Sequence, residues 1–96
     1  MYRIEQTETF SKWLRELKDI RAKARIRARI ERAAMGNFGD WKAEGGEVRA
    51  MRIDYGPGYR LYYTIRNSRL VILLCGGDKR TQEADIRKAH ALLEEE

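Results

Sequence analysis

The sequence predicts an α+β protein in which a helical hairpin packs on one face of an antiparallel sheet, in the order β-α-α-β-β-β-α. Two patterns lead to this class. Apolar residues in the first third recur every three or four positions, whereas residues 48–75 alternate or run continuously apolar between turn residues. A chain of 96 residues, 43% of them hydrophobic, suits a single domain over residues 1–96 with one core.

The N-terminal segment is expected to form a strand and then a helix. Tyr2–Thr7 alternates in polarity, which is typical of a short strand. Thr7 is a suitable N-cap, and Glu8 is favourable in the first helical turn. The helix then carries apolar residues at i, i+3, i+4 and i+7, which we expect to be core: Phe10, Trp13, Leu14 and Leu17.

A second helix is predicted over Ile20–Met35, with Gly36 and Asn37 as its C-terminal stop. Between Lys12 and Arg32 there are nine Lys and Arg against three acids. The cations on this second helix are Arg21, Lys23, Arg25, Arg27, Arg29 and Arg32. Such a run is either a solvated helix face or a surface that docks on a phosphate backbone or a ribosome.

Three strands are expected after the connection Asn37–Gly46. Val48–Ile53 alternates in polarity, and the Pro and Gly residues of Tyr55–Tyr59 predict a turn before the next strand, Tyr59–Arg66. After a second, short turn, Leu70–Cys75 is continuously apolar. This last segment is therefore predicted to be a central strand that is covered on both faces.

A C-terminal helix closes the predicted fold. Gly76 and Gly77 are expected to end the preceding strand, and Lys79 follows them. The helix should begin near Thr81, and its apolar residues are Ile86, Ala89 and Leu93.

Three cations are predicted to converge on one patch: Arg52, Arg60 and Lys79. Successive side chains of a strand point to opposite faces. If each strand turns its more apolar set inward, Arg52, Arg60 and Tyr62 emerge together on the other face. Either arginine alone would be an ordinary exposed cation, but the pair together with Lys79 suggests a site for a phosphodiester.

Composition excludes several other classes. The net charge of +5 favours polyanionic partners, although it also serves solubility. The single Cys75 lies in an apolar run and is expected to be a buried small hydrophobe, and no acidic or histidine spacing indicates a metal or cofactor. Residues 2–7 lack the apolar core of a signal peptide, and no apolar run approaches the roughly 20 residues of a membrane span, so we expect a cytoplasmic protein without membrane association.

Four motifs carry a resemblance to a known family. They are Phe10-x-x-Trp13-Leu14, Gly39-Asp40-Trp41-Lys42, Arg52-Ile-Asp-Tyr-Gly-Pro-Gly-Tyr-Arg60 and Leu74-Cys-Gly-Gly-Asp-Lys79-x-Thr81-Gln82-x-x-Asp85-Ile86. Over nearly its full length the chain resembles toxins of the RelE/ParE superfamily of bacterial type II toxin–antitoxin modules. Within that superfamily it is most similar to the addiction-module killer proteins related to HigB-type toxins.

The resemblance implies a function and partners. Many such toxins inhibit translation as endoribonucleases that cleave messenger RNA on the ribosome, and a cognate antitoxin, here expected to be a helix-turn-helix protein encoded next to the toxin, silences them. Other members inhibit DNA gyrase without being nucleases, and the fold does not choose between the two. A third alternative is a plain nucleic-acid-binding module that depends on Arg25, Arg27 and Arg29.

The resemblance, together with residue chemistry, also suggests roles. Arg52 and Arg60 would stabilise the phosphate charge, because a guanidinium binds phosphate bidentately and stays protonated. Lys79 would bind phosphate or transfer a proton. Further substrate contacts are expected from Tyr55, Tyr62, Gln82, Arg25 and Arg29. Tyr59 is either a stacking residue or core.

One departure from the family pattern concerns proton transfer. RelE-type nucleases often carry a Tyr near the C-terminus, and HigB-type ones a His. Here His90 borders the apolar stripe of the last helix, which favours a packing role and leaves Lys79 or a solvent-assisted group as the candidate for proton transfer. The non-nuclease alternative therefore stays open.

Overall fold

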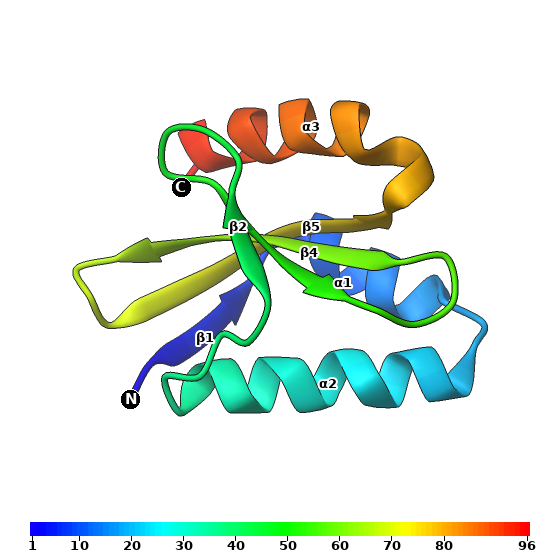
Figure 1. The fold of residues 1–96 in the computed structure, drawn as a ribbon. Coiled ribbons are helices and arrows are strands. Elements are labelled where there is room, and N and C mark those ends of the chain that lie inside the picture. Colours follow the sequence, from blue (N-terminus) through cyan, green and yellow to red (C-terminus); the bar gives the residue numbers. More distant parts are fainter.

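The computed structural model describes residues 1–96 and consists of a five-stranded sheet with helices on both faces (Figure 1). The elements are β1 (Arg3–Gln6), α1 (Glu8–Glu16), α2 (Ile20–Ala34), β2 (Trp41–Ala43), β3 (Arg49–Ile53), β4 (Tyr59–Arg66), β5 (Leu70–Asp78), the 3-10 turn η1 (Lys79–Thr81) and α3 (Gln82–Glu94). The α+β class and the helical hairpin against the sheet are confirmed.

The sheet differs from the predicted one in two respects. Its strand order is β1-β5-β4-β3-β2, and β1 runs parallel to β5, so the sheet is mixed and not wholly antiparallel. Alternation of polarity predicts which side chains share a face of a strand, but it does not predict which strand pairs with which. The second difference is β2, a three-residue edge strand inside the segment that we expected to be a connection.

One face of the sheet is covered by α1 and α2, whose residues share one core, and α2 runs below the strands in Figure 1. The helices contribute Phe10, Leu14, Ala22, Ile26 and Ala33 to this core, and the strands contribute Met51, Ile53, Tyr59, Leu61, Tyr63, Val71 and Leu73. The predicted parity of β3 and β4 is thus confirmed: their more apolar sets do turn toward the helical hairpin. Two side-chain caps begin the helices, since Thr7 accepts from Phe10 N at 3.0 Å and Asp19 accepts from Ala22 N at 3.2 Å.

The opposite face is covered by α3 (Figure 1). The residues of this second core are Val48, Ala50, Tyr62, Ile72, Leu74, Cys75 and Ala89. Burial of β5 on both faces is confirmed.

The glycine pair does not end β5, which continues through Gly76 and Gly77 to Asp78. A Cβ on Gly76 would collide with the indole ring of Trp13, and a Cβ on Gly77 would collide with the carboxylate of Asp85. The expectation that these glycines break the strand was therefore wrong. They are places where a helix side chain lies directly on the strand backbone.

Candidate functional site: a cationic cleft beside the third helix

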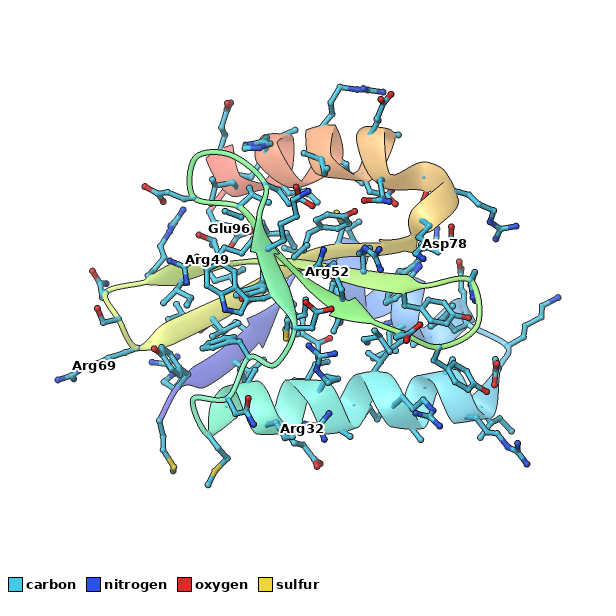
Figure 2. All side chains as sticks on the ribbon, viewed as in Figure 1. Arg32, Arg49, Arg52, Arg69, Asp78 and Glu96 are labelled. Atoms are coloured by element: carbon cyan, nitrogen blue, oxygen red, sulfur yellow. The ribbon has the colours of Figure 1, made fainter.

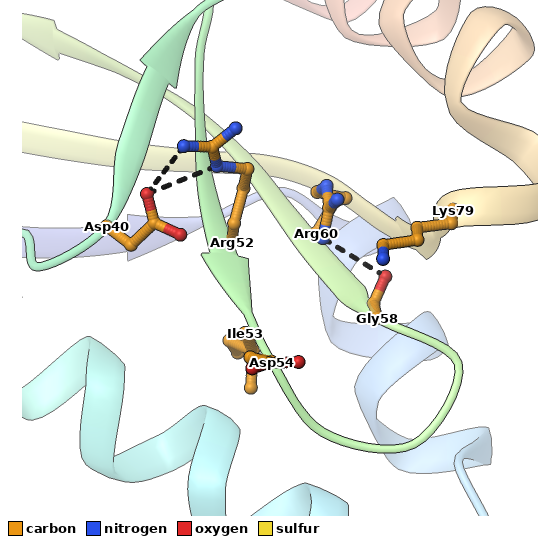
Figure 3. A pocket seen from close by; sticks show the side chains of 7 residues that line it. All are labelled: Asp40, Arg52, Ile53, Asp54, Gly58, Arg60 and Lys79. Atoms are coloured by element: carbon orange, nitrogen blue, oxygen red, sulfur yellow. Dashed lines mark hydrogen bonds and ion pairs between the residues drawn. The ribbon is translucent and has the colours of Figure 1, made fainter.

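The ends of β2, β3, β4 and β5 surround a cleft of about 400 Å³ (Figure 3). Its lining residues are Asp40, Arg52, Ile53, Asp54, Gly58, Arg60 and Lys79. The structure therefore brings together the three cations that we expected to converge. It also adds two carboxylates that the sequence interpretation did not place there.

Arg52 and Arg60 are directly opposed in the antiparallel pairing of β3 with β4. Both belong to the side-chain row that faces α3, because Ala50 and Tyr62 in the same rows are buried under that helix. Like charges placed directly opposite each other on a sheet are destabilising. An arrangement that costs stability and lies in a cleft is more typical of a binding site than of a structural contact.

Arg60 is the most unusual group in the cleft, because its side chain is buried (8% exposed) without a carboxylate partner. Its Nη1 donates to the carbonyls of Gly58 at 3.3 Å and Tyr59 at 3.1 Å, and its Nε is buried with no hydrogen-bond partner. A buried cation normally has an anionic partner, because burial removes its hydration. The absence of a carboxylate partner makes Arg60 the candidate anion-binding group of the cleft.

Arg52 differs from Arg60, since it is bound to Asp40. Its Nη2 lies 2.6 Å and its Nε 3.2 Å from the same oxygen, Asp40 Oδ1. The hydrogen bonds from Arg52 hold the pKa of the Asp40 carboxyl below its usual range. The side chain of Arg52 remains partly exposed to the cleft.

Lys79 comes directly after β5 and reaches the cleft from the side of α3 (Figure 3). Its methylene groups pass so close to Gly58 that a Cβ there would lie 2.9 to 3.0 Å from them, and Gly58 has φ +82°. Gly58 is therefore required both by the turn conformation and by the path of this lysine. The neighbouring Asp78 caps η1 and pairs with Arg80, so it does not neutralise Lys79.

Two further hollows share lining residues with the cleft. One shares Ile53 and Asp54 with it and is lined on α2 by Arg25, Ala28, Arg29 and Arg32. The other shares Lys79 and includes Gln82, Arg80 and Arg87 around the start of α3. Arg25 also stacks over the Tyr55 ring at 4.5 Å. Arg25, Tyr55 and Gln82 are thus near the cleft, and their roles as substrate contacts stay predictions.

The structure contradicts two of the expected substrate contacts. Tyr62 is 0% exposed, because α3 covers the face on which we expected it to emerge. It cannot stack on a base from that position. Arg29 is also buried, and its guanidinium donates to the backbone carbonyls of Arg52 (2.6 Å), Phe38 (3.0 Å) and Asp40 (3.2 Å). Arg29 therefore holds α2 to β3 and to the loop before β2, and its guanidinium is already bound to these three carbonyls.

Tyr59 and His90 both pack against other parts of the fold. Tyr59 is buried, lies edge-on to Trp13 with ring centroids 6.2 Å apart, and belongs to the core beneath the helical hairpin. A ring nitrogen of His90 lies 3.2 Å from the carbonyl of Glu44, in the loop before β3. This agrees with the packing role expected for His90. No three His, Cys, Asp or Glu side chains come together as potential metal ligands.

Asp40 and Asp54 are the site residues that sequence reasoning missed. The spacing along the chain gives no sign of Asp40 because the short strand β2 that brings it beside Arg52 was not predicted. Its place in the Gly39-Asp40-Trp41-Lys42 motif was the one available signal. Asp54 follows β3 directly, where it could have been expected near Arg52.

Comparisons with known proteins define the class. The model of the family described as "Phage derived protein Gp49-like (DUF891)" matches residues 12–94, so the chain belongs to this family. A Haemophilus influenzae protein described only as "Uncharacterized protein" is 53% identical over 92 residues, which cover 96% of this chain and 93% of that protein.

The fold is also that of a known toxin. The crystal structure of the isolated E. coli RelE toxin superposes with a TM-score of 0.68, over 91% of this chain and 98% of that one, at 18% sequence identity. The RelE-like fold inferred from the sequence motifs is thereby confirmed. Separately, no helix has the length and apolar character that crossing a bilayer requires.

Proposed function

We propose that this protein is the toxin of a type II toxin–antitoxin module and that it inhibits translation by cleaving messenger RNA on the ribosome. The observation that carries the proposal is the buried guanidinium of Arg60, which has no anionic partner and shares a cleft with Arg52 and Lys79. Membership of the Gp49-like family and the RelE-like fold agree with it.

The chemistry suited to this cleft is an internal attack within RNA. The ribose 2′-oxygen bonds to phosphorus, the bond from phosphorus to the 5′-oxygen breaks, and a 2′,3′-cyclic phosphate and a free 5′-hydroxyl result. Arg60 and Arg52 would donate to the non-bridging oxygens, where negative charge grows, and the loss of one such donor typically costs about 3–4 kcal/mol of barrier lowering. Lys79 would neutralise or protonate the leaving oxygen, while the proton of the 2′-hydroxyl would pass to solvent.

A non-nuclease toxin is the second candidate function, because the cleft offers no good general base. Its two carboxylates are the only acids that line it, and Asp40 has a lowered pKa, which makes it a poor general base. A toxin that binds nucleic acid or a protein without cutting RNA, as a gyrase inhibitor does, requires no such base.

The partners follow from the proposed function. A toxin of this type requires a cognate antitoxin, which we expect to be a small helix-turn-helix protein encoded beside it. The ribosome and its messenger RNA are the expected targets in the cytoplasm. The exposed cations on α2, such as Arg21 and Arg25, are available for contacts with ribosomal phosphates.

The test is brief induction of the protein in a bacterial host, followed by primer extension on abundant messages and measurement of translation and replication. New 5′ ends within translated regions, with translation stopping first, are the expected result. Arg60→Met should abolish the new ends, whereas the matched control Arg69→Met should retain them. Arg69 is an exposed cation at the turn between β4 and β5, away from the cleft (Figure 2). Intact messages together with stalled replication and poisoned DNA gyrase would favour the gyrase alternative.

A further inference from the structure

Asp40 is held in place by its backbone and is not a freely mobile surface acid. Arg29 binds the carbonyls of both Phe38 and Asp40, and the backbone N–H of Arg52 donates to the Asp40 carbonyl at 2.8 Å. The preceding Gly39 has φ +61° and lies so close to Arg29 that a Cβ there would approach Nη2 at 2.9 Å. The loop is therefore fixed in a position that presents the Asp40 carboxylate to β3.

The carboxylate occupies one of the two forked edges of the Arg52 guanidinium. The Nε and Nη2 groups form one fork of a guanidinium, and both donate to Asp40 Oδ1 (Figure 3). A phosphodiester oxygen can take this fork only if the carboxylate leaves it. Arg52 thus has a carboxylate partner in the free protein, whereas Arg60, directly opposite, has none and leaves its Nε without any hydrogen-bond partner.

The arrangement favours competition over proton transfer as the role of this acid. With a lowered pKa, Asp40 stays ionised throughout the neutral range, so it accepts a proton poorly but remains a full negative charge. Arg52, Arg60 and Lys79 supply three positive charges to the cleft, and Asp40 and Asp54 supply two negative ones. Asp54 makes no ion pair within the cleft, so only Asp40 competes directly for a guanidinium.

We propose that Asp40 is a built-in competitor of the phosphodiester: it occupies the fork of Arg52 in the free protein, and the bound nucleic acid must displace it. This inference rests on the proposed function only in that a phosphodiester is the ligand of the cleft. The anion first meets Arg60 and Lys79, and Arg52 then exchanges its carboxylate for a phosphate oxygen. Asp40 accordingly sets how strongly the cleft holds anions and restricts full engagement to ligands that can replace a fixed carboxylate.

The experiment measures the binding of a short single-stranded RNA whose riboses are all 2′-O-methylated, so that internal attack cannot occur. The full-length wild type, Asp40→Asn, Asp54→Asn, Arg52→Gln and the double variant Asp40→Asn/Arg52→Gln are compared by fluorescence anisotropy at low salt. Asp54→Asn is the matched control, because it removes the same charge from the same cleft without releasing an arginine. Two charges about 4 Å apart in water interact by about 1 kcal/mol, so the control should gain up to about fivefold in affinity.

Asp40→Asn should bind at least about tenfold more tightly than the wild type, and this gain should fall to the control level in the Arg52→Gln background. NMR of the Arg52 Nε–H group should show its signal shift when RNA is added to the wild type. Equal gains for the two Asn variants would overturn the proposal, since the effect would then be net charge alone. Weaker binding by Asp40→Asn would also overturn it and make Asp40 a residue that positions Arg52 for the ligand. No binding by either the wild type or Asp40→Asn overturns it as well.

These outcomes are independent of whether the protein cuts RNA. The ligand cannot be cleaved, and no ribosome is present in the assay. If primer extension finds intact messages but the affinity gain of Asp40→Asn depends on Arg52 as described, the competitor role stands and the nuclease proposal fails. If new RNA ends are found and the effects of Asp40→Asn and Arg52→Gln on RNA affinity are additive, the nuclease proposal stands and the competitor role fails.

Discussion

The indole ring of Trp13 lies on the backbone of Gly76, in the space that a Cβ at that position would occupy. The contact joins α1 to β5 at the point where the strand passes from the core toward Lys79. Trp13 also packs against Phe10 and Tyr59, with ring centroids 5.6 and 6.2 Å apart.

Gly76→Ala should therefore lower the free energy of unfolding by about 1–3 kcal/mol, because the methyl group forces the indole and strand apart. Urea denaturation followed by circular dichroism measures the change. Trp13→Leu in the same chain should recover part of the loss, since the smaller side chain leaves room for the methyl group. An additive combination of the two substitutions would argue against this contact.

Arg60→Met should abolish growth inhibition without destabilising the fold. The substitution replaces a buried cation that lacks an anionic partner and removes the like-charge pair with Arg52. The free energy of unfolding should stay unchanged or rise by about 1–2 kcal/mol, while growth inhibition on induction is lost. Denaturation of the purified variant and growth curves test both parts. A protein that loses stability together with toxicity would show that Arg60 is structural.

Tyr62→Phe is expected to leave growth inhibition intact. The hydroxyl of Tyr62 is buried and has no hydrogen-bond partner, so its removal should be neutral or stabilise the fold by up to about 1 kcal/mol. Tyr55→Ala is the comparison variant, because Tyr55 directly follows the cleft residue Asp54 and its ring stacks with Arg25. Loss of toxicity in a folded Tyr62→Phe protein would mean that α3 moves away from the sheet during action.

The thiol of Cys75 should be inert in the native protein. Burial raises its pKa from the ordinary value of 9.0 to about 12, so that it remains a neutral thiol where an exposed one begins to ionise. A chromogenic disulfide reagent at pH 8 should react slowly with the folded chain and fast in urea. The same shift implies a stability that is fully present below about pH 9 and falls as the pH rises toward 12, because the unfolded thiol loses its proton first. Rapid reaction of the native protein would contradict the burial.

Much of the fold could be predicted because polarity patterns report directly on local structure. The stripe from Phe10 to Leu17 and the parity of β3 and β4 follow from helix and strand periods alone. What the patterns do not contain is the position of α3 over the second face. For that reason Arg52 and Arg60 were correctly placed on one side, whereas Tyr62 in the same row was wrongly expected to be accessible.

The site was predictable only in part, for a similar reason. Convergence of Arg52, Arg60 and Lys79 follows from strand register and the position of the lysine after β5. The roles of Arg29 and Asp40 depend on the path of the loop before β2, which no periodic pattern specifies. A basic residue on an amphipathic helix gives no sign that it binds three carbonyls instead of a phosphate.

The parallel pairing of β1 with β5 has a consequence for the growing chain. Arg3 is aligned with Leu70, and β5 is the only strand that neighbours β1. The first strand to be synthesised therefore has no pairing partner until the last strand has been made. Until then the core under α1 and α2 lacks Val71 and Leu73 of β5, and contacts of such long sequence separation form late. Lys79 follows this last strand directly, so an unfinished chain has neither a completed sheet nor a completed cleft. Toxicity should therefore arise only when almost the whole protein has left the ribosome that made it.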